Sequence, residues 1–409
     1  MIGAHLPDWA WWAPTAHATV RNLFAEPPAT PADRVPAALR HAHALHHGHR
    51  LDDAIRAYTT VIAALGRDDG PDAPMTLGAR AGLAAALLDA GDLVEAAGEA
   101  LGVLERAERE LPSGHAIILA VRRVNARAMH GCGLLDPAES DLRDLMKAAD
   151  GQFGPAHRLT LRTRGDLAAL RTDRDLAPCD VAEEYTALIE AATDALGPTD
   201  EDVLGLRLDD SVRAIRHGRV NAAIPAIERL LATQAAALGA AHPQTIRARH
   251  HLAGALLLVG RPAEAELECR EAIRHAERLY GPADPRTLAA RDRLVRCLCV
   301  RKAYRWAERE CRATLAGWRV GYGPEHPVTL AARLRLAAIL RALGRGIEVA
   351  DHLGAVRRIT RRGLVQPDDP ALNGVRMPME LRRGWTPDYA HLLNNVRGIA
   401  ATRPEPNDF

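Results

Sequence analysis

The histidine-rich stretch at residues 41–49 is the part of the chain that offers metal ligands. His41, His43, His46, His47 and His49 crowd into it, and a helix would place His43 and His47 on one face, four positions apart. Two imidazoles at this spacing can bind a divalent transition metal. No cysteine and few carboxylates accompany them, so a polar helix end explains the stretch better than a metal site does. We predict no metal and no other cofactor.

The sequence carries none of the common catalytic motifs. It has no P-loop, no Gly-x-Gly-x-x-Gly turn, no His-Glu-x-x-His pair and no nucleophile elbow. We therefore expect a noncatalytic protein without catalytic residues. An enzyme or metal protein that uses the histidine cluster is the less favoured alternative.

A short signature recurs through the chain and reveals a repeat. One copy reads Gly-Pro-Glu-His-Pro-Val-Thr-Leu at residues 323–330, and a last, worn copy of the loop lies at residues 366–372. The threonine of the signature, or the residue in its place, serves as the anchor of each unit, and the anchors are Thr76, Ile118, Thr160, Val203, Thr245, Thr287 and Thr329. They lie 42 residues apart, or 43 where a loop at residues 174–180 holds one extra residue. This period predicts one repeat array rather than the two or three domains that the length of 409 residues allows.

Each unit reads as a helical hairpin. Gly239 suits the end of a helix, where a positive φ costs glycine little, and Pro243 suits the first position of the next helix. Leu252 and Leu256 share one face of that helix, and Pro262 opens the second helix after a break. The prolines therefore mark helix starts, where they remove no needed hydrogen bond.

The repeated pattern of Thr-Leu, x-x-Arg, x-x-Leu-Ala, Gly-Arg, Glu-Ala and the Gly-Pro-x-His-Pro loop resembles the tetratricopeptide repeat (TPR). It is similar to the 42-residue variety found in kinesin light chains and in many bacterial repeat proteins, and residues 245–330 carry it best. The resemblance implies an all-α fold, a right-handed α-solenoid superhelix of about seven to eight antiparallel helix pairs. It also implies that the first helices line a concave groove that binds extended peptides or partner proteins. The groove asparagines that kinesin light chains often carry are mostly missing here, so their cargo preferences do not transfer.

The resemblance and the composition together predict the domain boundaries. We expect an N-terminal capping or docking segment at residues 1–33, the repeat array at 34–362, C-terminal capping helices at 363–401 and a disordered tail at 402–409. The first segment holds Trp9, Trp11 and Trp12. These rings either cover the open apolar end of the array or dock a partner.

Helical geometry predicts which residues face the groove. At about 100° per residue, offsets 4, 7, 8 and 11 from the anchor share one face of the first helix, and offsets 2, 6, 9 and 13, the inner offsets, point the opposite way. The candidate binding residues at offsets 2, 6 and 9 are Arg127, Arg162, Asp166, Asp209, Arg247, His251, Arg293, Arg296 and Arg335. The series passes from aspartates to arginines, so it could orient a peptide with an acidic segment. Ordinary solvated positions are the equal alternative.

An arginine stands at offset 4 of every unit, and these residues are Arg80, Arg122, Arg164, Arg207, Arg249, Arg291 and Arg333. Such a row invites a nucleic-acid interpretation. Offset 4 lies beside the core, however, where a guanidinium reaches carboxylates of the second helices, for which Glu95, Glu264 and Glu348 are candidates. The formal net charge of +1 favours neither nucleic acid nor a membrane surface. We predict a structural role for these arginines.

The expected partner is another protein or an extended peptide segment, and the expected compartment is the cytoplasm. The six cysteines form no tight spacing pattern, and neither a signal sequence nor a membrane-spanning run is apparent. We interpret the chain as an adaptor or scaffold. A signalling-peptide receptor or an accessory protein of a specialised biosynthetic pathway is the alternative, and the sequence leaves the oligomeric state open.

Overall fold

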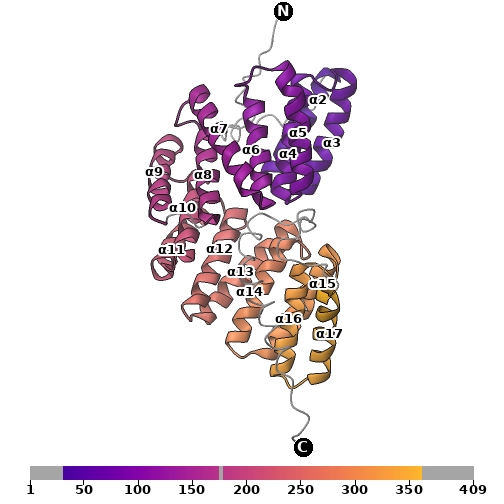
Figure 1. Ribbon diagram of the computed structural model, residues 1–409, viewed down its shortest axis with the longest axis vertical. Coiled ribbons are helices and arrows are strands. Elements are labelled where there is room, and N and C mark those ends of the chain that lie inside the picture. Colours follow the sequence, from indigo (N-terminus) through magenta and orange to yellow (C-terminus); the bar gives the residue numbers. More distant parts are fainter. Residues whose placement is uncertain (1–30, 175–177, 362–409) are drawn as a thin grey trace, which may run out of the picture. The chain divides into compact units, whose positions relative to one another are not determined.

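The computed structural model describes residues 31–174 and 178–361, and these residues form an all-α solenoid (Figure 1). Trp9, Trp11 and Trp12, the predicted C-terminal helices at 363–401 and the tail at 402–409 lie outside the described residues, as does the middle of the inserted loop. Sixteen helices are described, and they alternate as the first and second helices of eight repeats.

The first helices of the repeats are α2 (Pro31–His47), α4 (Pro74–Ala90), α6 (Ala116–Gly131), α8 (Arg158–Asp173), α10 (Glu201–Arg216), α12 (Pro243–Leu258), α14 (Pro285–Val300) and α16 (Pro327–Ala342). The second helices are α3 (Leu51–Asp68), α5 (Leu93–Glu110), α7 (Leu135–Phe153), α9 (Pro178–Leu196), α11 (Val220–Ala237), α13 (Pro262–Tyr280), α15 (Tyr304–Tyr322) and α17 (Gly346–Arg361). Five of the sixteen begin with a proline of the repeat pattern, namely Pro74, Pro243, Pro262, Pro285 and Pro327, as the sequence predicts.

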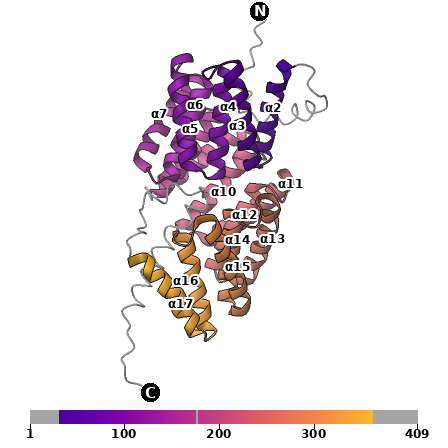
Figure 2. The same ribbon diagram turned by 90° about the vertical axis from the view of Figure 1, so that its right-hand side faces the viewer.

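The chain divides into two compact units between α10 and α11. The first unit comprises residues 1–218 and contains α2 to α10, and the second comprises residues 219–409 and contains α11 to α17. Within each unit consecutive helices pack side by side, as Figure 2 shows for α3 to α7 and for α12 to α15.

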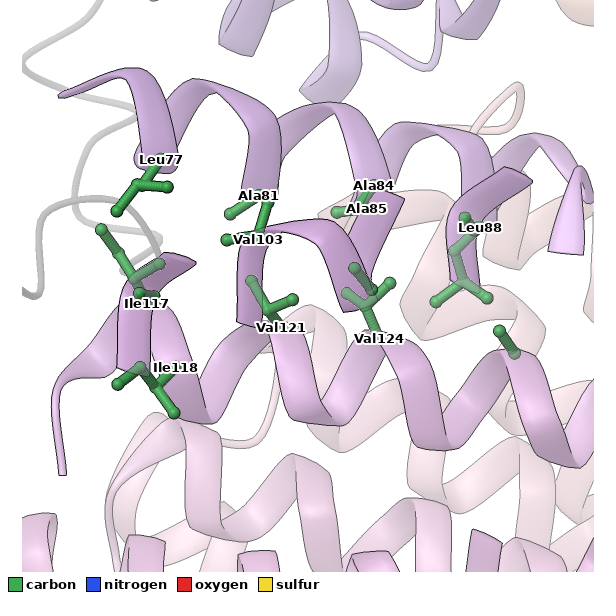
Figure 3. Packing of buried hydrophobic residues seen from close by; sticks show 14 of the residues in the cluster. Leu77, Ala81, Ala84, Ala85, Leu88, Val103, Ile117, Ile118, Val121 and Val124 are labelled. Atoms are coloured by element: carbon green, nitrogen blue, oxygen red, sulfur yellow. The ribbon is translucent and has the colours of Figure 1, made fainter. Parts of the chain in front are cut away.

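The core of each repeat is built from small and branched apolar residues. Figure 3 shows Leu77 and Leu88 of α4 facing Ile117 and Val124 of α6, with Val103 of α5 beside them. All five side chains are buried. Alanines fill many of the remaining contact positions, so neighbouring helices approach closely and the core needs few aromatic rings.

The histidine or aspartate of the signature is a helix N-cap. His242 Nδ1 accepts a hydrogen bond from the Gln244 amide at 3.3 Å, and Asp284 Oδ1 accepts one from the Arg286 amide at 2.8 Å. His115, His157, Asp200 and His326 cap their helices in the same way. The caps explain why the signature alternates between these two residue types, since both offer a short side chain with an acceptor atom.

The anchor threonine closes the loop between repeats. Its Oγ1 donates to the carbonyl oxygen of the glycine six residues earlier at 2.8–2.9 Å, in the pairs Thr76–Gly70, Thr160–Gly154, Thr245–Gly239, Thr287–Gly281 and Thr329–Gly323. All five threonines are at most 1% exposed. The glycine ends one helix with a positive φ, as at Gly281 (91°), and the hydroxyl holds its carbonyl beneath the next helix.

The first helices lie on the inner side of each unit. Consecutive first helices contact each other, as α4 contacts α6 and α12 contacts α14. Contacts of similar extent between successive second helices do not occur in the described ranges. Each stack of helices therefore curves toward its first helices, and the inner offsets of those helices are the place to look for a binding surface.

Replacing Thr287 by valine should lower the urea-unfolding midpoint, because the half-buried Gly281 carbonyl loses its donor while the shape of the side chain is kept. We expect a loss of about 1–2 kcal/mol. Thr186→Val is the matched control, since its hydroxyl bonds a carbonyl on the exposed side of α9, and it should change stability by less than about 0.5 kcal/mol. Unfolding is followed by far-UV circular dichroism. Equal losses of stability in the two variants would contradict the role given to the anchor threonine.

The His242 cap predicts a pH dependence of stability. Burial lowers the pKa of His242 below its ordinary value, so protonation favours the unfolded chain and stability is lost as pH falls below about 6.5. His242→Asp supplies the same kind of cap as Asp284, and its carboxylate does not titrate in this range. As pH falls from 7 to 5, the unfolding free energy of the variant should therefore rise relative to that of wild type by about 1 kcal/mol. His41→Gln, at an exposed position of α2, should run parallel to wild type. If the stability of His242→Asp depends on pH in the same way as that of wild type, the cap is refuted.

Candidate functional site

The offset-4 arginines tie the two helices of a repeat together. Their guanidinium groups pair with carboxylates of the second helix, in the pairs Arg80–Glu99 (2.5 Å), Arg122–Asp141 (2.8 Å), Arg249–Glu268 (2.6 Å) and Arg291–Glu310 (2.9 Å). The predicted structural role is confirmed for these four. The predicted acidic partners are wrong in two cases, because Glu264 pairs with Arg261 and Glu348 with Arg312. The partner of Arg249 is Glu268, which stands one helical turn after Glu264 on the second helix.

The histidine cluster lies against the core of the first repeat. His43 Nδ1 and the Tyr58 hydroxyl are hydrogen-bonded at 2.7 Å, and burial, with the charges of His47 and His46, lowers the pKa of His43 to about 3. His46 Nε2 lies 3.0 Å from the Asp89 carboxylate. His43 and His46 thus have structural partners on α3 and α4.

In the first unit the charged inner residues neutralise one another. The Asp166 carboxylate accepts a hydrogen bond from Arg123 at 2.6 Å and lies 3.5 Å from the Arg127 guanidinium. Arg162 donates to Asp202 at 2.8 Å. Asp209 is half-buried on α10. The structure brings Asp166 and Arg127 together, and both contribute to ion pairs inside the fold.

Burial alone would raise the pKa of Asp202, but the charges of Arg162 and Arg158 outweigh it and lower that pKa. Asp202 therefore stays ionised at neutral pH, and its charge compensates the arginines around it. The inner face of this unit offers a ligand little net charge.

In the second unit, offset 6 of one first helix reaches back to offset 5 of the preceding one. Arg335 Nη1 donates to Asp292 Oδ1 at 2.6 Å, and Arg293 Nη1 donates to the His250 carbonyl oxygen at 2.7 Å. Asp166 and Arg123 have the same register in the first unit. These predicted groove residues therefore also connect consecutive repeats.

The Arg293 guanidinium lies over Gly254 of α12. A Cβ at position 254 would stand 1.8 Å from Arg293 Nη1, so only glycine leaves room for this arrangement. Gly254 occupies offset 9, and a glycine in the middle of a helix costs about 1 kcal/mol relative to alanine. That cost is a sequence signal for a close approach, and the groove prediction did not use it.

Two apolar residues also lie at an inner offset and were absent from the predicted set. Leu258 of α12 and Val300 of α14 both stand at offset 13, and they are 67% and 59% exposed. Arg247, His251 and Arg296 are half-buried on the same face. The inner face of the second unit therefore combines a basic row with an exposed apolar row.

The second unit also has a small cavity of about 330 Å³ outside the inner offsets. It is lined by Glu266, Arg270, Leu298, Arg301, Ala303 and Trp306. Both arginines pair with the buried Glu266 carboxylate. The charged groups of this cavity thus pair with one another, and the arrangement indicates an ionic contact between α13 and the end of α14.

Arg335 and Asp292 form a buried ion pair, with side chains 10% and 3% exposed, and we predict strong coupling between them. Asp292→Asn and Arg335→Met should each destabilise the chain by about 3 kcal/mol, because each leaves a buried polar partner uncompensated. The double variant should lose less than the sum of the two by at least about 1 kcal/mol. The measurement is a double-mutant cycle from urea unfolding, and additive losses would show that the pair does not tie α14 to α16.

No helix in the described ranges is long and apolar enough to span a membrane. A comparison with curated proteins finds no match to this chain. Solved structures give several matches at low identity.

A putative kinesin light chain from Podosopora anserina with nearly identical TPR-like repeats is 22% identical, over 50% of this chain and 96% of that chain, with a TM-score of 0.46. A Rap protein complexed with competence and sporulation factor is 12% identical, over 80% of this chain and 90% of that one, with a TM-score of 0.50. A signal transduction ATPase with a tetratricopeptide repeat sensor, from Pyrococcus horikoshii, is 14% identical, over 88% of this chain and 53% of that one, with a TM-score of 0.53.

The family model described as tetratricopeptide repeat matches residues 245–286, which run from one anchor to the next. This unit contains α12 and α13, the hairpin whose sequence carries the signature most fully. Four other repeats have its buried threonine, at Thr76, Thr160, Thr287 and Thr329, and five other first helices have its side-chain N-cap. The chain is thus an array of 42-residue repeats that resemble those of kinesin light chains, and residues 245–286 match the tetratricopeptide repeat.

Proposed function

We propose that the chain is a noncatalytic adaptor or scaffold of the cytoplasm that holds a partner protein, or an extended peptide segment of one, on the inner face of its repeats. The observation that carries the proposal is the exposure of Leu258 and Val300 at inner offsets. Large apolar side chains of a first helix normally face the core, and an exposed pair in register on the curved side favours a contact with another molecule.

The polar chemistry of the inner faces supports binding rather than catalysis. The charged groups there are arginines and ion-paired carboxylates, with no nucleophile beside a general base in the contacts described. Cys132, Cys269, Cys297, Cys299 and Cys311 are free thiols, which fits a reducing compartment. We expect neither nucleic acid nor a membrane as the partner.

A second candidate is a receptor for a signalling peptide. The likeness of the fold to a Rap protein in complex with competence and sporulation factor favours this function. The two candidates share the same surface and differ in the size of the ligand. A third, an accessory role in a specialised biosynthetic pathway, would use the same surface for an enzyme partner.

The adaptor proposal predicts that Leu258→Asp weakens partner binding and Val320→Asp does not. Both residues are exposed and apolar in the second unit, but Val320 belongs to the second helix α15. A partner would be isolated with the full chain as bait, identified by mass spectrometry, purified and titrated by calorimetry. We expect at least a tenfold rise in Kd for Leu258→Asp, because a charge in an apolar contact is poorly solvated.

Circular dichroism of both variants controls for folding. If every identified partner binds both variants as tightly as wild type, the inner face is not the binding surface and the proposal fails.

A further inference from the structure

Two cysteines of the second unit face each other across the contact between α13 and α14. Cys269 Sγ and Cys297 Sγ lie 3.9 Å apart, and the two residues are 1% and 0% exposed. Both are free thiols, and we call them the thiol pair. The sulfurs of a disulfide are about 2.05 Å apart, so each sulfur would move by only about 1 Å to close the bond.

The thiol pair occupies core positions that other repeats fill with hydrocarbon side chains. Counted along the repeat, Ala100 and Ala128 stand at the equivalent positions, and both belong to one apolar cluster. Leu142 and Leu170 stand there one repeat later and share another cluster. A buried cysteine often acts only as a small apolar residue. Here, however, sulfur stands on both sides of one contact, and the two thiols are hydrogen-bonded to each other.

The two thiols differ in acidity. The hydrogen bond with Cys269, together with the charge of Arg293, lowers the pKa of Cys297 although burial opposes this shift. The same hydrogen bond and burial raise the pKa of Cys269. Cys297 is therefore the thiol that ionises first, and the thiolate is the form that reacts with oxidants.

The small cavity of the second unit lies beside the thiol pair. Glu266 precedes Cys269 by three positions, and Arg301 follows Cys297 by four. Residues at these spacings share a face of a helix, so the Glu266–Arg301 ion pair and the thiol pair are neighbouring contacts between α13 and the end of α14. Both residues of the ion pair line the cavity. A small oxidant in the cavity would therefore be close to the Cys297 sulfur.

We propose that Cys269 and Cys297 are a redox modification site, in which hydrogen peroxide converts the two thiols to a reversible disulfide that ties α13 to α14. The bond would join residues 28 positions apart and connect one repeat covalently to the next. It would restrict the unfolded chain more than the folded one, and so stabilise the second unit. The inference does not depend on the proposed function.

The reaction runs in two steps. The Cys297 thiolate attacks one oxygen of the peroxide, so an S–O bond forms, the O–O bond breaks, and the departing hydroxide takes up the proton released by Cys297 to become water. The Cys269 sulfur then attacks the sulfur of this sulfenic acid. The S–S bond forms, the S–O bond breaks, and the hydroxyl leaves with the Cys269 proton as a second water. Both sulfurs are oxidised and the peroxide is reduced, and a dithiol reverses the reaction by exchange.

The test uses the full chain with the substitution Cys299→Ser. Cys297 and Cys299 lie between Arg296 and Arg301 and would otherwise share one tryptic peptide. The folded chain is treated with hydrogen peroxide, its remaining thiols are alkylated, and it is digested without reductant for mass spectrometry. We expect the Cys269 and Cys297 peptides to be linked, and dithiothreitol to separate them. Oxidation should also raise the urea midpoint of unfolding by at least about 0.5 M.

Matched variants in the same background test the order of the steps. Cys269→Ala should stop at a sulfenic acid on Cys297, which dimedone traps, whereas Cys297→Ala should give neither a link nor a dimedone adduct on Cys269. Alanine already fills both positions in an earlier repeat, so both variants should fold. Cys311→Ala is the control, because this buried thiol of α15 donates to the Ala332 carbonyl at 3.6 Å. It should keep the link and the rise in midpoint.

The alternative is that the thiol pair only packs in the core. A linked peptide that forms in urea but not in the folded chain would overturn the proposal. So would peroxide that oxidises the half-buried Cys132 while both thiols of the pair stay reduced. A link that forms in the folded chain and leaves the urea midpoint unchanged would refute the stabilising tie between α13 and α14.

Discussion

The hydrogen bond from the anchor threonine to the glycine carbonyl six residues earlier sets the register on which the rest of the array depends. It recurs in five repeats at nearly the same length. Because it fixes how the loop folds beneath the next helix, successive first helices enter the stack at the same rotation. The same offsets then face inward in the five repeats that have this bond, so a local bond contributes to deciding which residues can form a common surface.

Much of the architecture could be predicted from the sequence, because it depends on local chemistry. The 42-residue period, the prolines at helix starts and the glycines at helix ends all act within a few residues of their own position. The N-cap at His242 was equally local but went unrecognised, since histidine is a less familiar cap than serine or aspartate.

The candidate site was harder to predict, for a physical reason. Helical periodicity gives the direction in which a side chain leaves its own helix. It does not give the residues that this side chain contacts on the neighbouring first helix, about 42 residues away in the sequence. Gly82 stands at an inner offset and is nevertheless buried against the Tyr58 ring of α3. Arg335 likewise points along the predicted direction and ends at Asp292. The helical angle predicts which residues lie on the inner face of a first helix. The tertiary contacts decide which residues of that face remain exposed.

The close approach of Arg293 to Gly254 has a consequence for how repeats of this chain may be exchanged. The two positions lie on different first helices, and the family unit that runs from one anchor to the next contains only one of them. If a repeat with those boundaries were transplanted, the Arg293 guanidinium would meet a side chain of the new neighbour in place of Gly254, or Gly254 would lose the guanidinium that covers it. The transferable module is therefore the interval from α12 through α14, and the effects of substitutions at 254 and 293 are expected to be coupled.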